Sequence, residues 1–123
     1  MSKTLCAVYG SLKTGLHNHV ILDNSKKLGD VIIGGFEMYS LGAFPAITES
    51  NVEDRIFAEV YEVTEGTFAR LDILEGYPNF YNRKKVDTPL GEAWIYFIKN
   101  TERFTDSRRV LPKEGVPYAS WRA

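Results

Sequence analysis

Short apolar and alternating segments run through most of the chain and predict a mainly β structure. Runs rich in β-branched and aromatic residues, bounded by turn-forming residues, are typical of strands. Six segments have this pattern: residues 4–9, 31–33, 36–41, 56–63, 85–88 and 93–98. The last two are expected to pair with each other. Gly34-Gly35 separates the second and third segments and predicts a hairpin turn, because glycine tolerates positive φ.

One segment has the start and stop signals of an α-helix. Thr64 suits the N-cap, where a side-chain oxygen accepts a backbone N–H, and Gly76 is a typical residue at a helix end. Between them, Phe68, Leu71 and Leu74 are spaced to share one face. The pattern therefore predicts a helix that buries this apolar face against the strands.

A carboxylate interrupts the apolar face of this helix. Glu75 follows Leu71 by four residues and Phe68 by seven, so it projects from the side that should be buried. Burying an unpaired carboxylate costs free energy and raises its pKa. Two interpretations stay open. Glu75 either bends to solvent or pairs with Arg70 or Arg83, or it is a general acid/base in a partly apolar cleft.

The turn after the first strand is a second candidate feature. Gly10 and Ser11 come directly after a buried apolar run. Such a turn can leave several backbone N–H groups pointing together toward an anion, although the same dipeptide also forms ordinary turns. The glycine and lysine spacing of a nucleotide-binding P-loop is missing here. No Gly-x-Ser-x-Gly sequence surrounds Ser11, which argues against a nucleophilic serine.

Composition narrows the class of protein. The chain has 123 residues and a formal net charge of −1. This length fits one domain with its own core, and the balanced charge lacks the positive field with which proteins capture nucleic acids. The single cysteine, Cys6, is expected to be a buried, inert thiol. Together with His17 and His19 it supplies too few ligands for a zinc site.

Signals for targeting or membrane insertion are missing from the sequence. Lys3 is followed by only a short apolar run, and no apolar stretch approaches the roughly 18 residues of a membrane span. We therefore expect a cytoplasmic protein with a single domain over residues 1–123. Its core would cover about 4–99, with a C-terminal extension at about 100–123. The aromatic residues of the extension that are expected to pack on the core are Phe104, Tyr118 and Trp121.

Two motifs, far apart in the chain, together carry a family resemblance. The first is Tyr-Gly-Ser-Leu-Lys at residues 9–13, with Asn-His at 18–19. The second is Leu-Asp-Ile-Leu-Glu-Gly-Tyr-Pro at 71–78, followed by Tyr81 and Arg83. In this order they resemble the γ-glutamyl cyclotransferase-like superfamily, most closely its γ-glutamylamine cyclotransferase and AIG2-like branch. The resemblance extends over about residues 5–99.

The resemblance implies both a fold and an activity. The fold would be α+β, a small and mostly antiparallel β-barrel with a few flanking helices and a pocket at one end. The enzyme, of carbon–nitrogen lyase or acyltransferase type, would use no cofactor and no metal. It would cleave a γ-glutamyl amide by attack of the substrate's own α-amine, and release 5-oxoproline and a free amine.

The resemblance also implies roles for individual residues. Glu75 would be the catalytic acid and base. The residues expected to bind substrate are Tyr9, Gly10, Ser11, Leu12 and Tyr81. Backbone N–H groups at residues 10–12 would hold the substrate carboxylate or the developing oxyanion. Tyr9 is expected to line the pocket, and Tyr81 to hydrogen-bond the substrate or Glu75.

Two functions follow from these expectations. The first is a γ-glutamylamine cyclotransferase-like enzyme acting on a small-molecule γ-glutamyl substrate, as a monomer or weak homodimer, without nucleic-acid or membrane partners. The alternative is a non-catalytic module of the same fold that binds a small metabolite, because a fold does not fix a function. The intact Glu75 favours the enzyme.

Overall fold

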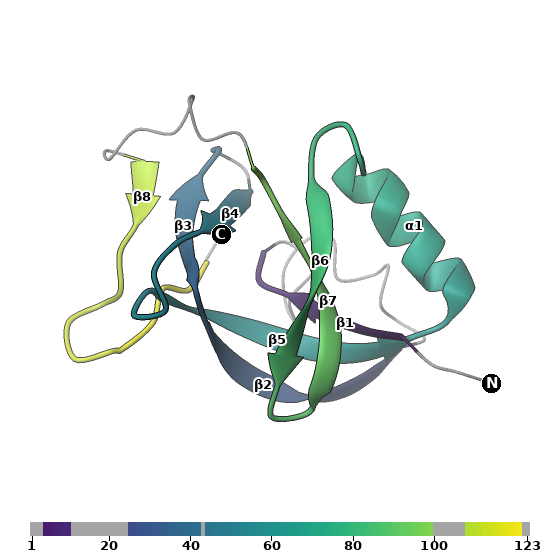
Figure 1. The fold of residues 1–123 in the computed structure, drawn as a ribbon, viewed down its shortest axis with the longest axis horizontal. Coiled ribbons are helices and arrows are strands. Elements are labelled where there is room, and N and C mark those ends of the chain that lie inside the picture. The colour runs from purple at the N-terminus through teal and green to yellow at the C-terminus, as the bar shows by residue number, and fades with distance from the viewer. Residues whose placement is uncertain (1–3, 11–24, 43, 100–107, 122–123) are drawn as a thin grey trace.

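The computed structural model describes residues 4–10, 25–42, 44–99 and 108–121, and Figure 1 shows their arrangement. Five strands form the larger sheet, in the order β2-β5-β1-β7-β6. Their bounds are Thr4–Val8 (β1), Lys26–Gly34 (β2), Arg55–Val63 (β5), Asn82–Thr88 (β6) and Gly91–Phe97 (β7). All neighbours pair antiparallel except β1 and β7, which run parallel. The expected pairing of the last two predicted strands is confirmed as β6 with β7.

A smaller sheet packs beside the larger one, in the order β4-β3-β8. Its strands are Phe36–Ser40 (β3), Pro45–Glu49 (β4) and Arg109–Val110 (β8). The backbone N–H of Ile98, directly after β7, donates to the carbonyl oxygen of Ile47 in β4 at 2.9 Å. This bond joins the two sheets at one point and continues the hydrogen bonding from one into the other.

The predicted hairpin at Gly34-Gly35 is wrong. β2 pairs with β5, whereas β3 pairs with β4 and β8, so β2 and β3 belong to different sheets. Gly35 has φ of +93°, and its backbone N–H donates to the carbonyl oxygen of Asp54 at 2.8 Å. The glycine pair therefore lets the chain turn a corner between sheets instead of folding back on itself.

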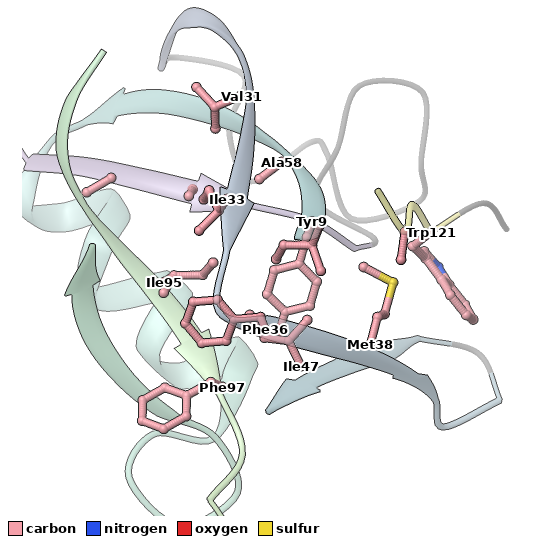
Figure 2. Packing of buried hydrophobic residues seen from close by; sticks show 14 of the residues in the cluster. Tyr9, Val31, Ile33, Phe36, Met38, Ile47, Ala58, Ile95, Phe97 and Trp121 are labelled. Atoms are coloured by element: carbon pink, nitrogen blue, oxygen red, sulfur yellow. The ribbon is translucent and has the colours of Figure 1, made fainter. Parts of the chain in front are cut away.

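The sheets wrap around one main hydrophobic core, which Figure 2 shows from close by. Phe36 and Met38 from β3, Ile47 from β4 and Ile95 from β7 meet there. A second cluster fills the space between the larger sheet and the helix, and includes Leu71. The expected α+β class with mostly antiparallel strands is thus confirmed, with one α-helix in the described part of the chain.

Helix α1 (Glu65–Glu75) begins and ends where the sequence predicts. The Thr64 side chain accepts the backbone N–H of Thr67 at 3.1 Å, and Gly76 closes the helix in the left-handed conformation. Leu71 is fully buried, but Leu74 is 41% exposed, so its predicted burial is wrong. Residues turn by about 100° each, which places Phe68 and Glu75 on one side of Leu71 and Leu74 on the other.

The C-terminal segment packs on the core through two of the three predicted aromatic residues. Trp121 lies in the main core cluster, and the ring of Tyr118 lies 5.9 Å from that of Phe57. The backbone N–H of Phe57 donates to the carbonyl oxygen of Ala119 at 2.8 Å, which fixes the segment along β5. Phe104 lies outside the described residues. In the described ranges no helix has the length and apolar character needed to span a bilayer.

Two leucine variants on the same helix test which face is buried. Leu71→Ala should lower the free energy of unfolding by about 2–5 kcal/mol, because it empties a fully buried position. Leu74→Ala, matched in residue type and helix, should cost less than about 1 kcal/mol. Denaturant unfolding followed by circular dichroism measures both. Equal losses in the two variants would contradict this orientation of α1.

Candidate active site

Glu75 is the last residue of α1 and is partly buried. Burial raises the pKa of its carboxyl to about 7, because the charged form loses hydration. Among the described residues no side chain makes a salt bridge or hydrogen bond to it. The two arginines considered as partners bind elsewhere: Arg83 pairs with Asp72, and Arg70 donates to Thr67 at 3.3 Å. Pairing with either arginine therefore does not explain the position of Glu75.

Two buried tyrosines lie close enough to Glu75 for its negative charge to raise the pKa of their hydroxyl groups. Tyr9 is 7% exposed and Tyr81 is 4% exposed. The pKa of both phenols is raised, mainly by burial and further by the negative charge of Glu75. Both tyrosines therefore stay neutral, and the three side chains form one cluster at the end of α1.

Each of these tyrosines donates its hydroxyl proton to a backbone carbonyl. Tyr9 donates to Tyr96 at 2.7 Å, and Tyr81 donates to Pro45 at 2.6 Å. In the described structure Tyr81 therefore does not donate to Glu75. Both hydroxyl oxygens keep lone pairs that can accept a hydrogen bond, either from a protonated Glu75 or from an ammonium group. Figure 2 shows the Tyr9 ring in the core near Phe36 and Ile47.

Gly10 follows β1 and packs directly against Pro45. A Cβ atom at Gly10 would lie 2.9 Å from both Cδ and Cγ of the Pro45 ring, closer than carbon atoms approach in proteins. Only glycine therefore fits there without displacing β4. Pro45 also accepts the Tyr81 hydrogen bond, so it connects two of the predicted site residues. Ser11 and Leu12, the other two residues of the predicted anion-binding turn, lie outside the described residues.

Asp72 and Arg83 anchor the helix end beside this cluster. Asp72 pairs with Arg83 and also accepts the hydroxyl proton of Tyr96 at 2.7 Å. The guanidinium carbon of Arg83 lies 4.2 Å from the ring centre of Tyr77 and 4.8 Å from that of Trp94. The second sequence motif contained Asp72 and was followed by Arg83, but it gave no sign of the contact with Tyr96, which comes from the distant strand β7.

Cys6 is placed where thiol chemistry is disfavoured. Cys6 is buried in β1, and burial raises the pKa of its thiol to about 12, so it stays protonated. Within the described ranges, no three side chains of the kinds that bind metals come together. Glu75 is the group at the helix end whose pKa is raised to near neutrality, and it is therefore the candidate for proton transfer.

A small α+β fold with a half-buried carboxylate near two buried tyrosines defines the kind of site, and comparison with known proteins gives the family. Residues 6–123 match the family described as γ-glutamyl cyclotransferase, AIG2-like. A Vibrio cholerae protein, named provisionally as a γ-glutamylcyclotransferase, is 42% identical over 100 residues, which cover 80% of this chain and 85% of that protein. The chain therefore belongs to the AIG2-like γ-glutamyl cyclotransferase family.

Solved structures agree with this fold. An uncharacterized protein from Pyrococcus horikoshii matches with a TM-score of 0.74 and 29% identity, over 87% of this chain and 85% of that one. An AIG2-like protein from mouse matches with a TM-score of 0.76 over 99% of this chain and 90% of that one. At 22% identity, this second likeness concerns the fold alone.

The raised pKa of Glu75 should make stability depend on pH. A carboxyl with a higher pKa in the folded state than in the unfolded state destabilises the fold as pH rises from about 4.5 to about 7. Glu75→Gln removes this effect. The free energy of unfolding of Glu75→Gln minus that of the wild type should therefore increase by about 2 kcal/mol between pH 5 and pH 8.

Urea unfolding at the two pH values measures this difference. Glu53→Gln changes an exposed carboxylate in the turn before β5 and serves as the matched control. If the Glu75→Gln and wild-type curves move in parallel with pH, the carboxylate is not held away from water.

Proposed function

We propose that this chain is a γ-glutamylamine cyclotransferase-type enzyme that converts a γ-glutamyl amide into 5-oxoproline and a free amine. The observation that carries the proposal is the position of Glu75, partly buried beside two neutral tyrosines, with a pKa of about 7. Membership of the γ-glutamyl cyclotransferase family supports the reaction class. Small-molecule γ-glutamyl compounds are thus the proposed substrates, and the reaction uses no water, metal or cofactor.

Glu75 acts first as a base in the proposed mechanism. The substrate's α-amine is an ammonium at neutral pH and must lose a proton before its nitrogen can attack. A carboxylate whose pKa lies near the working pH exists in both protonation states, which is the best compromise for accepting and returning a proton. The freed nitrogen then forms a bond to the γ-carbonyl carbon of the same molecule. This closes the five-membered ring.

Glu75 acts next as an acid. The tetrahedral intermediate collapses as the bond between the γ-carbon and the amide nitrogen breaks, and protonated Glu75 gives its proton to the departing nitrogen. The ring nitrogen still carries a second proton from the ammonium, which Glu75 accepts and passes to the released amine. Both protons thus leave with the amine, in its ammonium form, and Glu75 returns to its starting state. Because the attack is intramolecular, holding the glutamyl group in a folded conformation supplies much of the rate acceleration.

The proposed binding groups surround this carboxylate. Backbone N–H groups of Gly10, Ser11 and Leu12 would hold the substrate carboxylate or the oxyanion, as donors fixed in advance of the reaction. Contact between Gly10 and Pro45 supports this role for the start of the turn, since it holds the backbone against β4. The hydroxyl protons of Tyr9 and Tyr81 are engaged in hydrogen bonds to backbone carbonyls. The hydroxyl oxygens would therefore accept an N–H from the substrate ammonium.

Replacing the carboxylate tests the mechanism directly. Glu75→Gln should lower the rate of 5-oxoproline release from γ-glutamyl-ε-lysine and other γ-glutamyl amines by at least about 100-fold, because an amide of the same shape cannot accept the proton. In the wild-type enzyme, kcat/KM should rise with pH and reach half its maximum near pH 7. Chromatographic assay of 5-oxoproline measures both.

The controls separate catalysis from binding alone. Glu53→Gln, at an exposed carboxylate in the turn before β5, should keep wild-type activity. If Glu75→Gln is as active as wild type, Glu75 is not the acid/base. If calorimetry detects binding of γ-glutamyl-ε-lysine or 5-oxoproline but no γ-glutamyl amide is turned over, the chain is a binding module of this fold instead.

A further inference from the structure

Two exposed phenylalanines lie at the edge of the candidate active site. Phe44 directly precedes β4, and Phe80 lies in the connection between α1 and β6 that Figure 1 shows beside the helix end. Each ring belongs to a side chain that is 37% exposed. Their ring centres are 6.2 Å apart, with an interplanar angle of 73°, so they meet edge to face. They form a pair of exposed aromatic rings from two separate segments, which we call the aromatic rim.

The aromatic rim is continuous with the groups around Glu75. The ring of Phe80 meets that of Tyr81 edge to face at 4.9 Å. Tyr81 in turn donates its hydroxyl proton to Pro45, the residue after Phe44. The chain of contacts therefore closes on itself: Phe44 to Phe80, Phe80 to Tyr81, and Tyr81 back to Pro45.

Backbone hydrogen bonds hold the segment that carries Phe80 and Tyr81 against the end of α1. The backbone N–H of Phe80 donates to the carbonyl oxygen of Gly76 at 2.7 Å. The backbone N–H of Tyr81 donates to the carbonyl oxygen of Glu75 at 3.3 Å. The aromatic rim thus begins within a few residues of Glu75 and ends in solvent, which is the course that the outer part of a bound substrate would follow.

The two halves of a γ-glutamyl amide have different requirements. In the proposed function, the glutamyl half is held at Gly10 and its amide nitrogen lies at Glu75. The group attached to that nitrogen must then extend away from the buried cluster toward solvent. Contact between an exposed pair of aromatic rings and an apolar group of the substrate is favourable, most of all when that group is itself a ring.

We propose that the Phe44–Phe80 pair is the leaving-group subsite, and that the enzyme prefers γ-glutamyl amides whose amine carries an apolar, above all an aromatic, substituent. This inference rests on the proposed function and adds the class of amine to it. Phe44 and Phe80 contact the part of the substrate that takes no part in the bond changes. They set specificity and take no part in proton transfer.

The test compares three substrates that share one product, 5-oxoproline. They are γ-glutamyl methylamide, γ-glutamyl phenethylamide and γ-glutamyl-ε-lysine. The kcat/KM for the phenethylamide should exceed that for the methylamide by about tenfold or more, the discrimination usual for an apolar pocket. The charged lysine substrate should fall below the phenethylamide.

Variants then assign the preference to the aromatic rim. Phe44→Ala should bring the phenethylamide-to-methylamide ratio close to one, and Phe44→Leu should give an intermediate ratio. Because Phe44 is partly exposed and precedes the strand, these variants should fold, which circular dichroism checks. Leu111→Ala, at a 65% exposed position in the C-terminal segment, should keep the wild-type ratio.

The outcomes distinguish the two proposals. If no γ-glutamyl amide is turned over, the proposed function fails. If all three are turned over with equal kcat/KM, or if Phe44→Ala lowers all three equally, the proposed function stands and the subsite is wrong. If the wild type is a dimer by analytical ultracentrifugation and Phe44→Ala is a monomer, the rim is a contact between two copies, and the subsite is again wrong.

Discussion

The rest of the site depends on one constraint, a carboxylate held partly out of water at the end of a helix. Gly76 ends α1 in the left-handed conformation, so the chain turns back immediately after Glu75. The backbone N–H of Tyr81 then returns to the carbonyl oxygen of Glu75. This short return brings the segment that carries Tyr81 back against the end of the helix. A raised pKa is the direct consequence of that position.

The fold supports this constraint from both sides. On one side, Asp72 binds Arg83 of β6 and Tyr96 of β7, which fixes the last turn of α1 to the larger sheet. On the other, Pro45 of β4 packs against Gly10 and accepts from Tyr81. The site therefore forms where the helix, the end of β1 and the smaller sheet meet. No single element could hold the carboxylate there by itself.

Local signals in the sequence predicted the elements well, but not how they meet. Thr64 and Gly76 act through contacts within a few residues, so the ends of α1 could be predicted from the sequence alone. As a sequence, Gly34-Gly35 is compatible with a hairpin and with a corner between sheets, and the pairing of β2 with β5 decides between them. Leu74 has the spacing of a buried residue, yet it lies on the side of Leu71 away from Glu75 and is 41% exposed.

The candidate site was predictable as a motif and unpredictable as a set of contacts. The position of Glu75 on an apolar helix face identified it as a candidate site residue, without any knowledge of its neighbours in the fold. The acceptors of the Tyr9 and Tyr81 protons are backbone carbonyls 87 and 36 residues away, and backbone carbonyls leave no trace in a sequence pattern. The aromatic rim was missed for a similar reason, since Phe44 and Phe80 meet only after the sheets have formed.

The most direct measurement is a ¹³C NMR titration of the Glu75 side-chain carboxyl in protein labelled with ¹³C-glutamate. The Glu75→Gln variant assigns the resonance by its disappearance. A midpoint near pH 7 is the predicted result, because partial burial disfavours the charged form. A midpoint near 4.3, as for a glutamate in water, would show that Glu75 is fully hydrated, and would contradict its role as an acid/base tuned by burial.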